Sequence, residues 1–153
     1  MTPDLNVLLA ASRTDHPQHI PALRWLEQAI AGCATGGSIE VLPMVAAGFL
    51  RLASNPRVFP SPTPIRAAID FIDSLLAVAG VEMPELGREW PTLREFATAN
   101  NLSANDLTDA WIAAAVRTIG SHLVTFDRGF SRLLGRNELT VLSPSGAAKS
   151  QRE

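Results

Sequence analysis

Cysteine and lysine are almost missing from this chain of 153 residues, which contains one of each. Cys33 alone can build neither a disulfide framework nor a cysteine metal site, and this favours a reducing, cytoplasmic setting. Because Lys149 is the single lysine, arginine supplies twelve of the 13 basic residues. That composition suits phosphate contacts, although a GC-rich genome would produce the same bias.

Long apolar runs and an excess of positive charge are also missing. No window reaches the roughly 18 apolar residues of a membrane span. The run "VLLAA" (7–11) is too short for the apolar part of a signal peptide, and no basic residue precedes it. The formal net charge of −2 excludes a basic nucleic-acid coat, so any nucleic-acid binding must come from a local patch. We therefore expect a cytoplasmic protein with no membrane partner.

The sequence does contain an alternation of short strand-like runs and helical patterns. Hydrophobic residues make up 46% of the chain, which is enough for one domain with a core. The alternation predicts an α/β fold with a parallel sheet, over residues 1–142, followed by a polar tail at 143–153. The expected strands are "MTPD" (1–4), part of "GSIEV" (37–41), "SHLVTFD" (121–127) and "LTVLS" (139–143).

Helical spacing and capping residues predict the helices. Thr63 is expected to cap a helix that ends before Gly80, and Thr92 with Glu95 has the pattern of a capping box. The segment 106–120 is apolar on nearly every face, so its helix should be central and buried. Trp25, Trp90 and Trp111 are expected in the core. Two helices are predicted to begin near Leu5 and near Pro43. The others are predicted at 19–32, 64–79, 92–100, 106–120 and 128–134.

Acidic residues stand at the ends of two predicted strands and at the start of the buried helix. Asp4 ends the first strand, Asp127 ends "HLVTFD", and Asp109 lies in the first turn of "DAWIAAAV". Asp106 precedes Asp109 by three residues and shares its helical face. Ligand sites form beyond the carboxyl ends of parallel strands, so these carboxylates are expected to gather at one end of the sheet.

Carboxylates that lie close together repel one another and need protons or cations. Oxygen ligands without cysteine favour Mg²⁺ or Mn²⁺ over Zn²⁺. A divalent ion held in this way can polarise a phosphoryl oxygen and activate a water molecule, which suggests phosphodiester hydrolysis. Asn6 and Thr125 each lie two residues from one of these acids and are candidates to orient it.

Each acid also has a structural interpretation. Asp106 and Asp109 suit the start of a helix, where an acid caps or complements the dipole. Asp127 suits a turn before Arg128-Gly129. Asp4 is the hardest to explain in this way, because an apolar run follows it immediately and burial of a charge is costly.

Four segments taken in order resemble a PIN domain, specifically a VapC-type toxin ribonuclease of the VapBC toxin–antitoxin pairs. They are "PDLNVLLAAS", "GFLRLASNPRVFPSPTP", "LTDAWIAAAV" and "LVTFDRGFSRL". Each motif alone is weak, but the ordered set is fairly specific and extends from about residue 1 to 142.

The resemblance implies a three-layer α/β/α fold with a mainly parallel sheet. It implies an endoribonuclease that depends on Mg²⁺ or Mn²⁺ and acts on tRNA or ribosomal RNA, a homodimer, and a VapB-type antitoxin whose tail covers the acidic pocket. Carried over by position, Asp4, Asp109 and Asp127 match the catalytic, metal-binding carboxylates, and Asn6 and Thr125 match their polar neighbours. Arg51, Arg57 and Arg128 are candidates for RNA or antitoxin contacts, and a solvated surface role suits each equally well.

The chain departs from the family pattern at the second acid. Members usually carry a glutamate near the start of the helix that contains "GFLR", whereas Pro43 or Gly48 occupies that place here. Glu40 is the nearest upstream glutamate. Either Glu40 reaches the site, or Asp106 supplies the charge, or metal binding is weaker.

Two other classes of function compete with a ribonuclease. The missing glutamate is also compatible with a catalytically inactive PIN-like binding module. An acidic phosphatase or phosphoacceptor domain fits less well. A haloacid-dehalogenase-type phosphatase needs D-x-D where this chain has "DLN", and a receiver domain needs a late lysine, but Lys149 lies in the tail.

Overall fold

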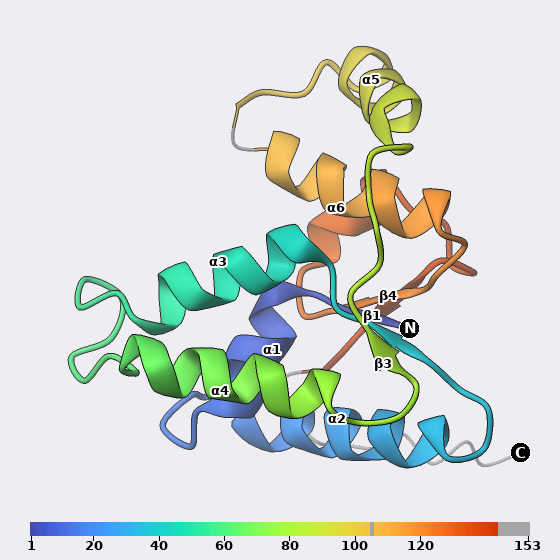
Figure 1. Ribbon diagram of the computed structural model, residues 1–153. Coiled ribbons are helices and arrows are strands. Elements are labelled where there is room, and N and C mark those ends of the chain that lie inside the picture. Colours follow the sequence, from blue (N-terminus) through green and yellow to red (C-terminus); the bar gives the residue numbers. More distant parts are fainter. Residues whose placement is uncertain (105, 144–153) are drawn as a thin grey trace, which may run out of the picture.

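A sheet of short parallel strands organises the computed structural model, which describes residues 1–104 and 106–143 (Figure 1). The strands form two parallel ladders, β1–β4–β5 and β2–β3. The Glu40 N–H donates to the Met1 carbonyl over 3.0 Å, so the spatial order is β3–β2–β1–β4–β5. The strands are Thr2–Pro3 (β1), Ile39–Glu40 (β2), Val81–Glu82 (β3), Leu123–Thr125 (β4) and Leu139–Val141 (β5).

Helices lie on both sides of this sheet, which confirms the predicted α/β class. In Figure 1, α6 lies above the strands and α2 below them, while α3 and α4 extend to one side as an antiparallel pair. The helices are Leu5–Ser12 (α1), His19–Cys33 (α2), Pro43–Ala53 (α3), Ile65–Leu76 (α4), Trp90–Ala99 (α5), Leu107–Thr118 (α6) and the 3₁₀ helix Arg128–Arg132 (η1).

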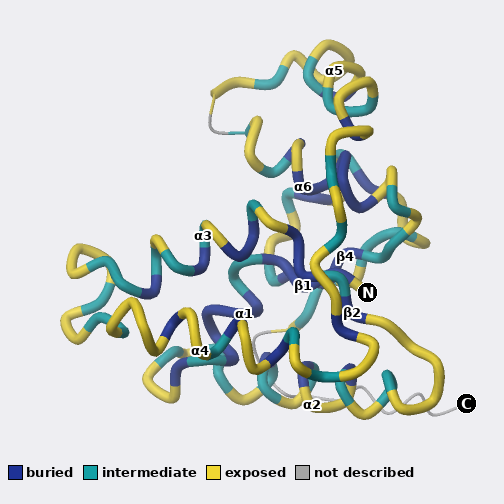
Figure 2. The backbone as a smooth tube through the Cα atoms, viewed as in Figure 1, coloured by how far each residue is buried: buried dark blue, intermediate teal, exposed yellow. Residues whose placement is uncertain are grey.

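The core is densest where α1 and α6 approach the strands. Figure 2 shows buried backbone concentrated in the strands, in α1 and in the middle of α6. Residues 7–11 of α1 and 112–116 of α6 are all buried. The apolar run after Asp4 is therefore the central packing segment, and it fixes that aspartate beside the core.

Two predicted helix caps were wrong. Thr63 does not cap α4, because its hydroxyl accepts a hydrogen bond from Arg13 Nη1 (2.9 Å). Helix α5 begins at Trp90, which leaves Thr92 inside the first turn rather than at a cap. Pro64 occupies the cap position of α4, and Pro91 lies in the first turn of α5, where a missing N–H costs no helical hydrogen bond.

The tryptophans also depart from the prediction. Trp25 is half-buried and packs on the core, but Trp90 is 63% exposed and Trp111 is 40% exposed. Helix α6 is nevertheless buried on every side at residues 112–116, as predicted, and Trp111 lies exposed just before this stretch. Figure 2 shows α5 as mainly exposed, and Phe96 is its buried residue.

The remaining expectations concern β3, the polar tail and the membrane. Strand β3 was not predicted, since two residues are too few to show alternation. Residues 144–153, which make up nearly all of the predicted tail, lie outside the described residues. No described helix combines the length and the apolarity needed to cross a membrane.

Candidate active site

Three of the predicted aspartates line one cavity at the carboxyl ends of the central strands. From β1, the strands β2 and β3 follow on one side of the sheet and β4 and β5 on the other. The strand order therefore reverses between β1 and β4, and ligands bind at such a topological switch point in open α/β sheets. Asp4 follows β1 directly, Asp127 follows β4 by two residues, and Asp109 projects from the first turn of α6. The cavity has a volume of about 190 Å³, and its other lining residues are Leu5, Asn6, Leu9, Leu52, Thr108, Ile112 and Phe130.

The Thr125 hydroxyl is the central contact of the polar network beneath this cavity. It donates to Asp4 Oδ2 over 2.6 Å, and it accepts from Asn6 Nδ2 and from the Asp127 N–H, each over 2.9 Å. Asn6 Oδ1 in turn accepts from the Phe126 N–H (3.1 Å). The network ties the end of β1 to the end of β4, and it places Asn6 and Thr125 where they orient the acids.

Asp4 is a carboxyl group held in an unfavourable environment for charge. Its side chain is 5% exposed. Burial raises its pKa to about 6, although hydrogen bonds from Thr125 and the Leu5 N–H oppose the rise, and the charges of Asp109 and Asp127 add to it. Asp4 therefore titrates near neutral pH, and a cation that arrives in the cavity would compete with a proton for it.

Asp109 experiences the same environment more weakly. Burial and the charges of Asp127 and Asp106 raise its pKa, while Arg132 lowers it. Asp127 is exposed, and its Oδ1 accepts from the Gly129 N–H over 2.6 Å. This bond starts η1, so the turn interpretation and the acid-site interpretation of Asp127 hold together. In the described part of the chain no basic group forms an ion pair with any of these three aspartates.

Asp106 lies just outside the cavity. Its Oδ1 pairs with Arg132 Nη2 (3.2 Å), and its Oδ2 accepts from the Ser103 hydroxyl (2.8 Å). Hydrogen bonds from Ser103 and Arg132 hold the pKa of this carboxyl below its usual value. Asp106 is thus already compensated, and it influences the site mainly through its charge on Asp109.

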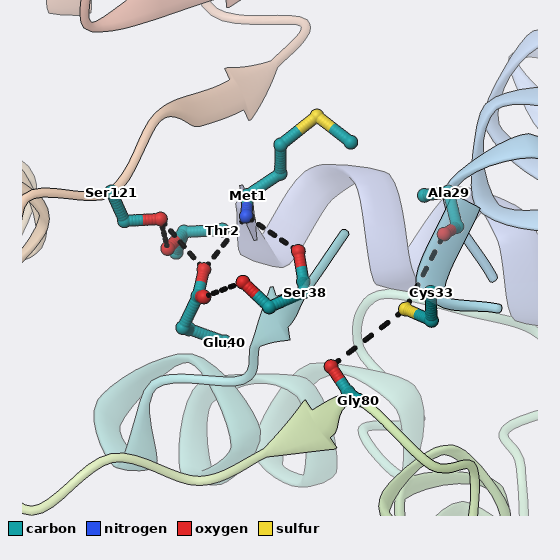
Figure 3. A network of polar contacts seen from close by, with 8 residues as sticks. All are labelled: Met1, Thr2, Ala29, Cys33, Ser38, Glu40, Gly80 and Ser121. Atoms are coloured by element: carbon teal, nitrogen blue, oxygen red, sulfur yellow. Dashed lines mark hydrogen bonds and ion pairs between the residues drawn. The ribbon is translucent and has the colours of Figure 1, made fainter. Parts of the chain in front are cut away.

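Glu40 lies on β2 and is held in a different network, shown in Figure 3. Its carboxylate accepts from the Met1 amino group and the Ser121 hydroxyl, each over 2.7 Å, and from the Ser38 hydroxyl. It is not among the residues that line the acidic cavity. The structure therefore separates Glu40 from the three aspartates, whereas Gly48, the alternative position for a second acid, packs against Leu5 next to Asp4.

The predicted arginines lie at different places around the site. Arg128 is exposed directly after Asp127, and Arg51 is exposed on α3, where it lines a separate cavity with Thr108. Arg57 lies in the loop between α3 and α4, at the end of those helices remote from the strands (Figure 1). The sequence analysis missed Arg132, whose only signal is its place five residues after Asp127 in the same turn.

The site offers the oxygen donor atoms that a hard divalent cation binds, but these atoms do not form a ready-made ligand set. Three carboxylates without ion pairs face one small cavity, and Mg²⁺ and Mn²⁺ prefer such oxygen ligands. Within residues 1–104 and 106–143, no three His, Cys, Asp or Glu side chains are gathered closely enough to hold an ion as they stand. The residues therefore fit a divalent metal ion in the kind of ligand atom that they offer.

Comparison with known proteins decides the family. Residues 1–134 match the model of the PIN domain. The chain belongs to the PIN domain family. The three aspartates that line the cavity come from the segments that resembled this family in the sequence.

Relatives of this PIN domain carry the VapC name. Ribonuclease VapC37 of Mycobacterium tuberculosis is 36% identical over 133 residues, which are 86% of this chain and 90% of the relative. Ribonuclease VapC31 of the same species is 35% identical over 132 residues, with 84% and 89% covered. The recognition of a VapC-type PIN domain is thus confirmed.

A solved structure shares the fold. The crystal structure of VapBC2 from Rickettsia felis, bound to a DNA fragment from its promoter, contains a chain that matches with a TM-score of 0.64 and 17% identity. The match covers 93% of this chain and 98% of that chain. It confirms the predicted three-layer α/β arrangement.

Proposed function

We propose that this PIN domain is the toxin of a type II toxin–antitoxin system and acts as an endoribonuclease that depends on Mg²⁺ or Mn²⁺. Its substrate is RNA, of the tRNA or ribosomal class. The names of the VapC ribonucleases to which it is 35–36% identical support the reaction class. The observation that carries the proposal is the convergence of Asp4, Asp109 and Asp127 on one cavity without a basic partner.

Different residues around the cavity have different roles in the proposed phosphodiester hydrolysis. Asp4, Asp109 and Asp127 would hold the metal ion, and a bound Mg²⁺ or Mn²⁺ polarises a phosphoryl oxygen and lowers the pKa of water. The Thr125 hydroxyl holds Asp4 Oδ2 and the backbone N–H of Asp127 at fixed positions relative to each other, and Asn6 fixes the direction of that hydroxyl. Arg128 and Arg132, at the rim, offer guanidinium groups to the RNA phosphate.

The partner proposed is a VapB-type antitoxin that covers the acidic cavity. The similarity to a chain in the VapBC2 structure supports this class of partner through the fold. A homodimer remains part of the proposal on the strength of the family resemblance. Arg51 and Arg57 remain candidates for contacts with RNA or the antitoxin.

RNA cleavage by the purified protein tests the proposal. The assay compares Mg²⁺, Mn²⁺ and EDTA, and it compares the wild type with Asp109→Asn. Asp73→Asn is the matched control, because Asp73 is an exposed aspartate on α4, away from the cavity. We expect cleavage to be lost in EDTA and in Asp109→Asn and retained in Asp73→Asn. Equal cleavage by a folded Asp109→Asn protein would refute the site.

A binding module without activity is the second candidate, and one observation favours it. Glu40 is committed to Met1, Ser38 and Ser121, so the place of the usual second acid is not filled from β2. Such a module would show neither Mn²⁺ binding at millimolar concentration nor cleavage of any RNA. If the protein binds an antitoxin peptide but neither binds Mn²⁺ nor cleaves RNA, this alternative is correct.

A further inference from the structure

Helix α5 stands apart from the rest of the molecule and leaves an apolar groove on α6. In Figure 1 it lies above α6, against which it chiefly packs. The groove between them has a volume of about 420 Å³, within the range of small-ligand sites. We call it the tryptophan groove. Its lining residues are Trp90, Leu93, Arg94, Ala97, Thr98, Leu107, Thr108 and Trp111.

Two indole rings in this groove are exposed, and one of them is held in place by a buried acid. Trp90 and Trp111 are 63% and 40% exposed. The Trp111 Nε1–H donates to Glu89 Oε1 over 2.9 Å, and Glu89 Oε2 accepts from the Gly87 N–H over 2.6 Å. Glu89 itself is 6% exposed. Burial of a carboxylate is costly unless hydrogen bonds compensate it, and here those bonds fix an indole ring that remains open to solvent.

The groove adjoins the acidic cavity, because both are lined by Thr108. Trp111 and Thr108 also line a cavity of about 550 Å³ beside α3, together with Arg51. Thr108 in addition lines the cavity of the three aspartates and immediately precedes Asp109. A chain molecule bound at the acidic cavity would therefore lie next to these two hollows.

Each hollow carries one exposed arginine. Arg94 lines the tryptophan groove and Arg51 lines the hollow beside α3. Neither guanidinium forms an ion pair within the described segments of the chain. Flat aromatic faces beside uncompensated guanidinium groups suit a ligand with planar rings and phosphates.

We propose that the tryptophan groove binds an unpaired nucleotide of the RNA substrate, with a base stacked on Trp90 and Trp111 and a phosphate on Arg94. The proposal rests on the proposed ribonuclease function and specifies single-stranded RNA as the form that enters the site. A second copy of the chain is the competing occupant, because exposed tryptophan, leucine and arginine are also typical of protein interfaces.

RNA binding without cleavage tests this assignment. The probe is a fluorescently labelled single-stranded 12-nucleotide RNA, titrated in EDTA and followed by anisotropy. Loss of one base–aromatic stack should weaken binding by roughly ten-fold in Trp90→Leu, while Trp90→Phe should retain most of the affinity. Trp25→Phe, on α2, is the matched control and should bind as the wild type does.

A second measurement uses the wild type and the Trp25→Phe control, so it does not depend on how the Trp90 variants fold. The same RNA should quench the tryptophan fluorescence of the wild type, and the quenching should remain in Trp25→Phe. A duplex of the same sequence should bind several-fold more weakly, since its bases are not free to stack.

Other results overturn the proposal. Equal affinity in Trp90→Leu and the wild type, with no quenching, would exclude base stacking in the groove. If sedimentation also shows a wild-type dimer that dissociates in Trp90→Leu, a second copy occupies the groove. These experiments measure binding and not cleavage, so they test the groove separately from the ribonuclease function. If only the ribonuclease function is wrong, RNA will bind in the groove but remain intact with Mg²⁺ or Mn²⁺.

Discussion

At the scale of single residues, two hydrogen bonds explain how the carboxyl group of Asp4 is tolerated next to the apolar core. Asp4 is buried by α1 and the strands, yet it keeps two hydrogen bonds, from Thr125 and from its neighbour Leu5. The network satisfies the carboxyl oxygens without supplying a positive charge. This combination leaves the site dependent on a proton or a cation.

The raised pKa of Asp4 predicts a pH dependence of stability. Between pH 4 and 6 the unfolded chain has Asp4 ionised, whereas the folded chain still holds the proton, so the free energy of unfolding falls as the pH rises through this window. The difference between 3.8 and about 6 corresponds to about 3 kcal/mol. Asp109, whose pKa burial also raises, acts in the same direction.

Denaturant unfolding in EDTA at pH 4.5 and 7.5 measures this effect. Asp4→Asn should lose less stability than the wild type between these pH values, and Asp73→Asn should behave as the wild type. Identical pH dependence in Asp4→Asn would show that the buried carboxyl is not the group responsible.

The Thr125 hydroxyl should matter more for activity than its size suggests. Thr125→Val keeps the shape of the side chain but removes the donor to Asp4 and the acceptor for Asn6 and the Asp127 N–H. We expect cleavage to fall by about 10- to 100-fold, as for other residues that orient metal ligands. Circular dichroism should show a folded protein. Full activity in Thr125→Val would mean that Asp4 needs no orientation.

At the scale of elements, prediction succeeded where pattern and topology agree. The convergence of Asp4, Asp109 and Asp127 on one cavity was predicted because they follow strands or begin a buried helix, and parallel strands bring such ends together. Their role in metal binding stays a prediction. The exposure of Trp90 and Trp111 could not be predicted, because aromatic residues at helical spacing look alike in a core and in a groove. The ion pair of Arg132 with Asp106 and the network around Glu40 depend on tertiary contacts between distant segments, which carry no local pattern.

Helix α3 offers a test of the missing acid. A Cβ atom at Gly48 would lie 3.3 Å from Leu5 Cδ2, so a side chain there fits after a small shift of a flexible neighbour. Replacement of glycine in a helix interior gains up to about 1 kcal/mol of helix propensity. Gly48→Glu should therefore fold and strengthen Mn²⁺ binding relative to Gly48→Ala, which is the control for packing. Equal affinity in the two variants would show that this position does not reach the site.

At the scale of the whole molecule, truncation tests the predicted domain boundary at residue 142. Among the described residues, the buried apolar side chains lie between Val7 and Leu134, and Leu139 and Leu142 pack against them. The family match ends at residue 134. Removal of residues 144–153 should leave the melting temperature within about 2 °C, which corresponds to less than about 1 kcal/mol. A larger decrease would contradict the predicted domain boundary at 142.

The three carboxylates at the end of the sheet are proposed to hold a divalent metal ion in this PIN domain. Calorimetric titration of Mn²⁺ into the purified, antitoxin-free protein at pH 7.5 tests it most directly, with Asp109→Asn and the Asp73→Asn control. We expect saturable binding in the wild type and in Asp73→Asn, and none at the site in Asp109→Asn. Mn²⁺ binding of equal strength in Asp109→Asn, or no binding to the wild type at millimolar Mn²⁺, would contradict it.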